Sequence, residues 1–281
     1  MTTLSNNPLA KHFRQPALHL RLPSQGKWWK MGSLELPVTG EIPIYPMTAR
    51  DEITMKTPDA LLNGSSTAHV IESCCPSIKN AWDMPVSDLD TLLIAIRIAT
   101  YGNEMDFTAV CPHCGEQNEH AIDLTVMLSN IGLLNWEEPI KVNGLAITLK
   151  PMSYEEYNKN SLGNFNEQRL IQLSQDETLS DEEKTQRFNS LFNQLIESGI
   201  EQMSFNIHSI TTEDGTTVSD RAFIKEFLDN CEKSIWEAIK AKLDGLRDSN
   251  KYNELNLTCS NNECSKEFKA PFLFEQSNFF G

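Results

Sequence analysis

The chain has 281 residues, which is enough for one large domain or two small ones. Apolar residues make up 40% of it, and glycine and proline occur 13 times each, as in an ordinary globular protein. The formal net charge of −15 repels phosphate backbones and anionic lipid. We therefore expect neither nucleic acid nor a membrane surface as the partner.

The longest uninterrupted apolar stretch, Leu92–Ile96, is far shorter than the roughly 20 residues that a membrane span needs. Residues 1–20 contain no apolar run typical of a secretory leader. The expected compartment is a cytoplasm.

Residues 1–14 are polar and show no hydrophobic pattern, so we expect a flexible arm. From residue 17 to residue 46, short β-prone pieces alternate with proline and glycine. Because proline lacks a ladder donor, this pattern predicts edge strands or irregular hairpins. The pieces are Leu18–Leu22, Leu34–Val38 and Ile42–Tyr45.

Helix signals follow in the first half of the chain. Thr48 is a candidate N-cap for a helix that ends near Gly64, and a second helix is expected over Ser66–Cys74. Ser87, with Asp90 three positions on, predicts an N-capped and largely buried helix that stops at Gly102.

The rest of the chain alternates strands and helices. Asn143-Gly144 is a type I′ turn signal, and Ser153 with Glu156 resembles a capping box, as does Ser180 with Glu183. The expected strands are 104–110, 118–124, 140–142, 145–149, 204–210, a short strand at 218, 255–258 and 268–274. The expected helices are 153–173, 180–198, 219–230 and 232–247.

This order predicts an α+β protein. It consists of a β-rich N-terminal segment, a helical body, and a zinc ribbon formed by the middle of the chain and the C-terminal tail. By role we divide it into an arm at 1–14, an α+β domain with the first zinc knuckle at 15–150, and a helical insertion at 151–250. The second knuckle and an aromatic tail at 251–281 complete the ribbon.

Two cysteine pairs carry the chemistry. Cys111-Pro-His-Cys114-Gly115 is a zinc-knuckle sequence in which two thiolates can turn onto one ion, and Cys259 and Cys264 form a second, C-x4-C pair between strands. Four thiolates complete a closed tetrahedral site of the structural kind, with no position left for water or substrate. The sequence therefore predicts that Cys111, Cys114, Cys259 and Cys264 bind structural zinc and tie the tail to the middle of the chain.

Alternatives to this site stay open at this point. Each pair can be reduced or form its own small disulfide, and His113 or His120 can replace a thiolate. The chain has seven cysteines, and Cys74, Cys75 and Cys231 show no ligand spacing, so we interpret these three as small buried apolar residues.

Catalytic signatures are missing from the sequence. It contains no H-E-x-x-H, G-x-S-x-G, Walker or G-x-G-x-x-G motif. Asp88 and Asp90 stand at a predicted helix start, where the helix dipole favours acids without any catalytic role. We predict that the protein is not an enzyme.

Two aromatic groups are candidate contact surfaces. Trp28-Trp29, between two lysines, is either a partner-binding patch or part of the core. The tail carries four phenylalanines with little charge and must be buried in this chain or against a neighbour, and we favour partial docking on a partner. They are Phe272, Phe274, Phe279 and Phe280.

Several segments together resemble the bacteriophage T4-type baseplate hub assembly protein family of contractile-tailed phages. The resemblance runs from about Pro16 to the C-terminus and is densest between Leu22 and Gly115. The segments are Leu22–Gly26, Gly40–Glu52, Pro85–Asp88, Arg97–Gly102, Cys111–Gly115 and Ser277–Phe280.

The resemblance implies a non-enzymatic structural or chaperone-like assembly role, with other baseplate or tail hub proteins as partners in an oligomer or heteromeric assembly. It implies a place in the virion tail baseplate, in the host cytoplasm during assembly, or in both. The knuckle cysteines carry over to the same four positions, although the C-x4-C pair is looser than the usual C-x2-C. The rival interpretation is a zinc-ribbon adaptor or a small zinc enzyme.

Overall fold

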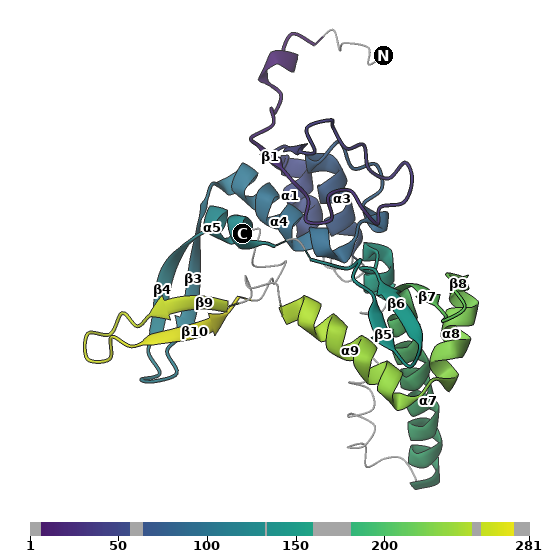
Figure 1. Ribbon diagram of the computed structural model, residues 1–281. Helices are drawn as coiled ribbons and strands as arrows, with labels where there is room; N and C mark the ends of the chain where they lie inside the picture. The colour runs from purple at the N-terminus through teal and green to yellow at the C-terminus, as the bar shows by residue number, and fades with distance from the viewer. Residues whose placement is uncertain (1–6, 57–63, 133, 160–180, 249–253, 273–281) are drawn as a thin grey trace. The chain divides into compact units, whose positions relative to one another are not determined.

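The computed structural model describes residues 7–56, 64–132, 134–159, 181–248 and 254–272. These residues form two compact units. Unit 1 is built from segments of 1–81, 88–132 and 251–281, and unit 2 from segments of 82–87 and 133–250 (Figure 1). The chain therefore passes from unit 1 to unit 2 twice, at 82–87 and at 133–250, and returns to unit 1 each time. The mixed α+β class predicted from the sequence is confirmed.

Unit 1 begins with the short 3-10 helix η1 (Ala10–His12) and two short strands, β1 (Leu18–Leu20) and β2 (Ile42–Ile44). The strands pair antiparallel, with Leu18 opposite Ile44. The α-helices of unit 1 among the described residues are α1 (Ala49–Met55), α3 (Ser65–Cys74), α4 (Val86–Tyr101) and α5 (Leu124–Asn130). The alternation of β2 buries its two isoleucines completely, and α4 buries the apolar run 92–96.

Local signals predicted part of this unit correctly. Thr48 caps α1 in a full capping box with Asp51. Two expectations are wrong. The piece Leu34–Val38 forms no strand, because its pairing is limited to one bridge between Leu34 and Ile78. Ser87 is not an N-cap, because α4 already begins at Val86.

Polar side chains tie distant segments of unit 1 together. Arg14, the last residue of the predicted arm, donates to the carbonyl oxygens of Pro46 and Ser73 at 2.7 Å each. It also pairs with the buried Asp51 carboxylate at 3.4 Å. These bonds hold the chain near residue 14 against α1 and α3. Whether the arm before it is flexible stays a prediction.

A second polar tie holds the proline- and glycine-rich loop after β1. The Asp88 carboxylate in α4 is buried and accepts hydrogen bonds from Ser24 N at 2.7 Å, Ser24 Oγ, and Trp29 Nε1 at 3.0 Å. Burial outweighs these bonds and raises the pKa of Asp88 to about 6. Asp88 is thus an anchor for the loop, a role that its place at a helix start did not reveal. Trp28 and Trp29 are both half-buried.

Unit 2 is a four-stranded antiparallel sheet in the order β5-β6-β7-β8, contacted by the helices α7, α8 and α9. Its core includes Ile147, Ile207, Ile224 and Ile239. The strands are β5 (Ile140–Val142), β6 (Leu145–Leu149), β7 (Ile207–Thr211) and β8 (Thr217–Val218). The helices are α7 (Asp181–Phe205), α8 (Arg221–Asn230) and α9 (Lys233–Asp248), and η2 (Ala81–Asp83) is a short 3-10 helix near the first boundary between the units.

The hairpin of β5 and β6 is where the sequence placed it, and Asn143 and Gly144 both have the positive φ that a type I′ turn requires. The Ser153–Glu156 capping box is present, with Glu156 N donating to Ser153 Oγ at 3.2 Å and Ser153 N donating to the Glu156 carboxylate at 2.9 Å. Its helix is seen over 154–159. The remainder of the predicted helix 153–173, together with Ser180, lies outside the described residues.

Candidate metal centre

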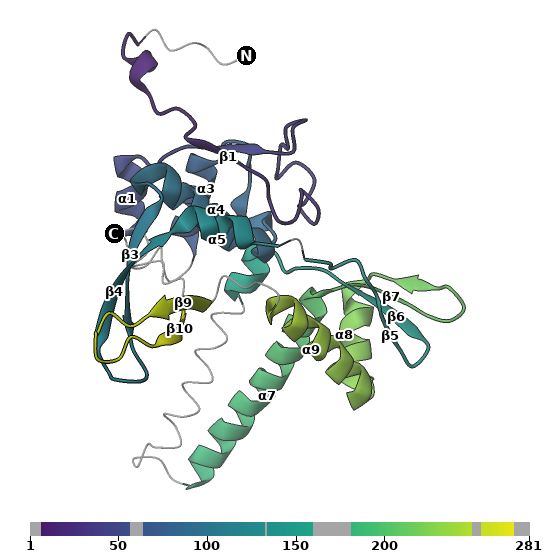
Figure 2. The same ribbon diagram turned by 60° about the vertical axis from the view of Figure 1, so that its left-hand side comes forward.

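Two hairpins of unit 1 carry the cysteine pairs. The first joins β3 (Glu104–Val110) to β4 (Gln117–Asp123), and the second joins β9 (Glu254–Thr258) to β10 (Glu267–Pro271). In each, the first cysteine follows directly on the first strand. Both views show the second hairpin lying beside the first (Figures 1 and 2). The predicted strands on either side of both pairs are confirmed to within a few residues.

The two turns close in the same way despite their different lengths. Cys111 N donates to Glu116 O at 2.8 Å, and Cys259 N donates to Lys266 O at 3.0 Å. The residue after the second cysteine has positive φ in both turns, +76° at Gly115 and +46° at Ser265. The C-x4-C pair is therefore a longer version of the C-x2-C knuckle.

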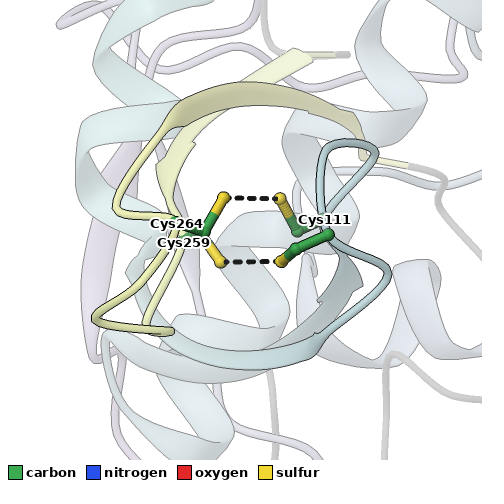
Figure 3. Close-up of side chains that lie close together, drawn as sticks. Cys111, Cys259 and Cys264 are labelled. Carbon is green, nitrogen blue, oxygen red and sulfur yellow. Dashed lines mark hydrogen bonds between the residues drawn. The ribbon is translucent and has the colours of Figure 1, made fainter.

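The four sulfur atoms converge between the turns (Figure 3). The Sγ atoms of Cys111 and Cys264 are 4.0 Å apart, and those of Cys114 and Cys259 are 3.6 Å apart. All four lie within 4.8 Å of one another. A tetrahedral zinc ion with Zn–S bonds of about 2.3 Å places its sulfur ligands about 3.8 Å apart. The spacing of this cluster, which we call the four-sulfur cluster, fits such an ion.

The surroundings of Cys111 favour a thiolate. Burial on its own would raise the pKa of this thiol, but hydrogen bonds from the backbone N–H groups of His113 and Cys114 and from neighbouring thiols outweigh it. They lower the Cys111 pKa to about 7. Because the thiolate is the form that binds metal, this shift favours an ion at Cys111. At Cys114 a backbone hydrogen bond from Glu116 is outweighed by burial and by hydrogen bonds with the other three thiols, and the pKa is raised to about 12.

Among the described residues, little apolar packing supports the cluster. Cys111, Cys259, Phe268 and Ala270 form a small buried group of their own. The aromatic ring of Phe107 lies 5.9 Å from that of Phe272, the one tail phenylalanine among the described residues, and Phe272 is buried. Residues 273–281, with the other three, lie outside the described part of the chain.

A buried amide adds a polar link between the hairpins. Asn118 in β4 accepts hydrogen bonds from Ser260 N at 2.6 Å and Ser260 Oγ at 2.7 Å, while its own amide nitrogen donates to Glu116 O at 2.8 Å. Asn118 is fully buried. Sequence reasoning missed this residue, because its partner is 142 positions away and no motif links the two.

A family model described as T4 bacteriophage base plate protein matches residues 20–281. The chain belongs to this family. Comparisons with curated proteins and with solved structures found no match. The resemblance seen in the sequence is thereby confirmed over nearly the full chain, and the family assigns a structural or assembly role at a phage baseplate, with other baseplate proteins as partners.

Neither histidine near the first knuckle joins the four-sulfur cluster, which consists of cysteines alone among the described residues. His113 is exposed in the turn. The ring of His120 lies edge-on to Phe268 at 6.4 Å, and its buried Nε2 has no hydrogen-bond partner among the described residues. In this baseplate protein, the geometry favours four sulfur ligands over a mixed set.

The remaining cysteines lie elsewhere. Cys74 and Cys75 are fully buried in unit 1, and Cys231 is half-buried against the core of unit 2. Burial, followed by the nearby Asp51 carboxylate, raises the pKa of Cys74 to about 12. A thiol that stays protonated at neutral pH is a poor nucleophile and a poor ligand, which agrees with a packing role.

In the part of the chain that the structure describes, no helix is both long enough and apolar enough to cross a lipid bilayer.

Proposed function

We propose that this baseplate protein acts without catalysis, as a structural or chaperone-like assembly protein of the tail hub, and that a zinc ribbon serves as its rigid docking element. One observation carries the proposal: four sulfur atoms from two hairpins meet at zinc-ligand spacing although 145 positions separate Cys114 from Cys259. The proposed ligands are Cys111, Cys114, Cys259 and Cys264.

The donor set supports a structural role for the ion. Four thiolates fill the tetrahedral positions of zinc, so no position is left to activate water or polarise a substrate. The apolar group around the cluster is small, with Phe268 as its largest buried side chain. The ion would therefore supply the stability that a larger core supplies elsewhere, and would hold both hairpins in one orientation.

Charge supports the choice of partners. The net charge of −15 favours basic faces on other baseplate or tail hub proteins and disfavours nucleic acid and anionic membranes. The proposed places of action are the tail baseplate of the virion and the host cytoplasm during assembly. Membership of the baseplate family gives other baseplate proteins as the partner class, and the negative charge favours those with a basic face.

Metal content tests the site. Full-length protein purified without chelator should contain about one zinc per chain by elemental mass spectrometry, and all seven thiols should react once the protein is denatured and the metal removed. Cys111→Ser should lose the zinc. Cys231→Ser is the matched control, because this half-buried cysteine lies in unit 2, and it should keep the zinc. Absence of zinc from the wild type, or its retention in Cys111→Ser, would show that the assignment is wrong.

Complex formation tests the docking role. The full chain is mixed with the other baseplate proteins of its own phage, and stable complexes are identified by size-exclusion chromatography with mass spectrometry. The wild type and Cys231→Ser should enter a complex, and Cys111→Ser should be lost from it. A Cys111→Ser variant that lacks zinc and still binds normally would leave the metal site in place and refute its role in docking.

A further inference from the structure

The four-sulfur cluster also offers a covalent way to join the two hairpins. Sγ of Cys111 lies 4.0 Å from Sγ of Cys264. Sγ of Cys114 lies 3.6 Å from Sγ of Cys259, and we call these two pairs the facing pairs. Figure 3 shows both contacts running from one turn to the other. The S–S bond of a disulfide is about 2.05 Å long, so each facing pair needs to close by about 2 Å or less to form one.

Each facing pair joins a more accessible cysteine to a buried one. Cys114 is exposed and faces the buried Cys259. Cys264 is half-buried and faces the buried Cys111. A zinc-bound cysteine is a thiolate, and oxidation of cysteine follows thiolate character and exposure. A small oxidant from solvent therefore reaches Cys114 first, and the thiolate that faces it belongs to the other hairpin.

Contacts outside the cluster keep the facing pairs opposite each other. Ser260, directly after Cys259, donates to the buried Asn118 of β4 from its backbone nitrogen at 2.6 Å and from Oγ at 2.7 Å. The ring of Phe268 in β10 lies edge-on to that of His120 in β4, with the centroids 6.4 Å apart. None of these contacts uses a sulfur atom, so they persist while the cysteines react and hold the second hairpin in register with the first.

We propose that oxidation replaces the metal by two disulfides between the hairpins, Cys114–Cys259 and Cys111–Cys264, once the virion has left the reducing host cytoplasm. Disulfides are rare in a cytoplasm and persist at virion surfaces. The inference rests on the proposed zinc site and on the proposed place in the tail baseplate. Each disulfide would link residues 145 or 153 positions apart, and so constrains the unfolded chain far more than a disulfide within one turn.

Hydrogen peroxide is the oxidant in the proposed step. The Cys114 thiolate attacks one oxygen of the peroxide, the O–O bond breaks, hydroxide leaves, and Cys114 becomes a sulfenic acid. The Cys259 thiolate then attacks the Cys114 sulfur, so that the S–S bond forms, the S–O bond breaks and a second hydroxide leaves. Two thiolates have then given two electrons to one peroxide, and two protons from solvent convert the hydroxides to water. The other facing pair reacts with a second peroxide in the same way, and the four residues can no longer hold an ion as thiolates.

Peptide mapping of the oxidised full chain tests the pairing. Trypsin places the cysteines of the first turn in peptide 98–141 and those of the second in peptide 252–266. Zinc-loaded protein treated with hydrogen peroxide, alkylated under denaturing conditions and digested without reductant should lose its zinc and four of its seven reactive thiols. It should yield the two peptides as one disulfide-linked species. Cys231→Ser is the matched control and should give the same linked species.

Further cleavage identifies the partners. Cleavage after Glu263 separates the two cysteines of the second turn, and fragmentation of the peptide bond before Pro112 in the mass spectrometer separates those of the first. Cys114 should then be found bonded to Cys259. Hydrogen exchange gives an independent measurement: oxidised protein should keep its protection in β9 and β10 when a chelator is added, and dithiothreitol should abolish that protection.

Two results would overturn the inference. One is a pair of separate peptides, each with its own internal disulfide. The other is a chain that keeps its zinc and all seven thiols at a peroxide concentration that fully oxidises free glutathione. Absence of zinc before the treatment would instead refute the proposed metal site, and the peptide map of the same sample would still decide the pairing.

Discussion

In unit 2, a sheet and three helices share an apolar core that joins Ile147, Ile207 and Ile239. The two hairpins of unit 1 share a much smaller group, in which two of the four buried members are cysteines. Elsewhere, unit 1 has an apolar core of its own, with Ile42, Ile44 and the run 92–96 buried, and the buried Asp51 and Asp88 carboxylates join segments that are far apart in sequence. The difference teaches that one chain can stabilise one region by apolar area and another by a few specific links. The first kind of region tolerates the loss of a polar group, whereas the second depends on each link.

Removing the metal should produce the largest difference in stability between the hairpins of unit 1 and the core of unit 2. Apparent binding free energies of structural zinc are about 10–16 kcal/mol, more than the whole stability of many domains. A chelator, or Cys111→Ser, should therefore abolish hydrogen-exchange protection in β3, β4, β9 and β10 while α8 and α9 keep theirs. Exchange followed by mass spectrometry measures both regions at once. Equal loss of protection in both units would contradict the comparison.

A cavity in the core of unit 2 should have the opposite effect to metal removal: it should destabilise unit 2 and leave the metal site unchanged. Ile239 is fully buried in α9, and Ile239→Ala should lower the free energy of unfolding by about 2–5 kcal/mol. Zinc content should not change. Urea unfolding monitored by circular dichroism gives the first quantity, and elemental analysis gives the second. The exposed neighbour Lys240 offers the control, since Lys240→Ala should change stability by no more than about 0.5 kcal/mol.

The anchor at Asp88 should make unit 1 sensitive to pH. Its pKa is raised from 3.8 to about 6 in the folded state, so the folded protein holds this proton more tightly than the unfolded chain does. The stabilisation is fully present below about pH 4 and is lost as pH rises through 6; its size is on the order of 3 kcal/mol.

Asp88→Asn removes this titration. The stability difference between the wild type and Asp88→Asn, measured by urea unfolding at several pH values, should shift in favour of the wild type as pH falls from 7 to 4. A difference that stays constant over this range would mean that burial does not raise the pKa of Asp88.

The smallest effect is expected at the polar link between the hairpins. Asn118→Ala removes the acceptor of both Ser260 hydrogen bonds and should cost about 1 kcal/mol. The change should appear as faster loss of metal to a chelator, because the second hairpin is then held less firmly. Asn118→Asp keeps an acceptor oxygen and should exchange metal more slowly than Asn118→Ala. Identical rates would show that the metal alone holds the hairpins together.

Features set by neighbouring residues were predictable from the sequence. The turn at Asn143-Gly144 needs two residues that accept positive φ, and the caps at Thr48 and Ser153 need a partner three positions on. The cysteine pairs were visible for the same reason, since each knuckle has a local spacing. That the two pairs would meet was a reasonable expectation from the chemistry of zinc, and the structure brings their sulfur atoms together.

Features set by distant contacts were not predictable. Residues 204–210 alternate like a strand, yet α7 continues to Phe205 because Met203 packs into the core, and β7 begins only at Ile207. Asp88 looked like an ordinary acid at a helix start because Ser24, its main donor, is 64 positions away. Local pattern limits what a segment can form, and tertiary packing selects among those forms.

The wide separation of the two knuckles has a consequence during synthesis. At about 5–20 residues per second, the ribosome needs roughly 7–30 s to add the 145 positions between Cys114 and Cys259. All of the residues of unit 2 between 133 and 250 are added in that interval, before the second hairpin exists. Until then the first hairpin supplies only two of the four sulfur atoms of the cluster. A chain cut short by 30 residues can therefore complete unit 2 but not the four-sulfur cluster. Closure of the cluster would then mark a chain that has been translated nearly to its end.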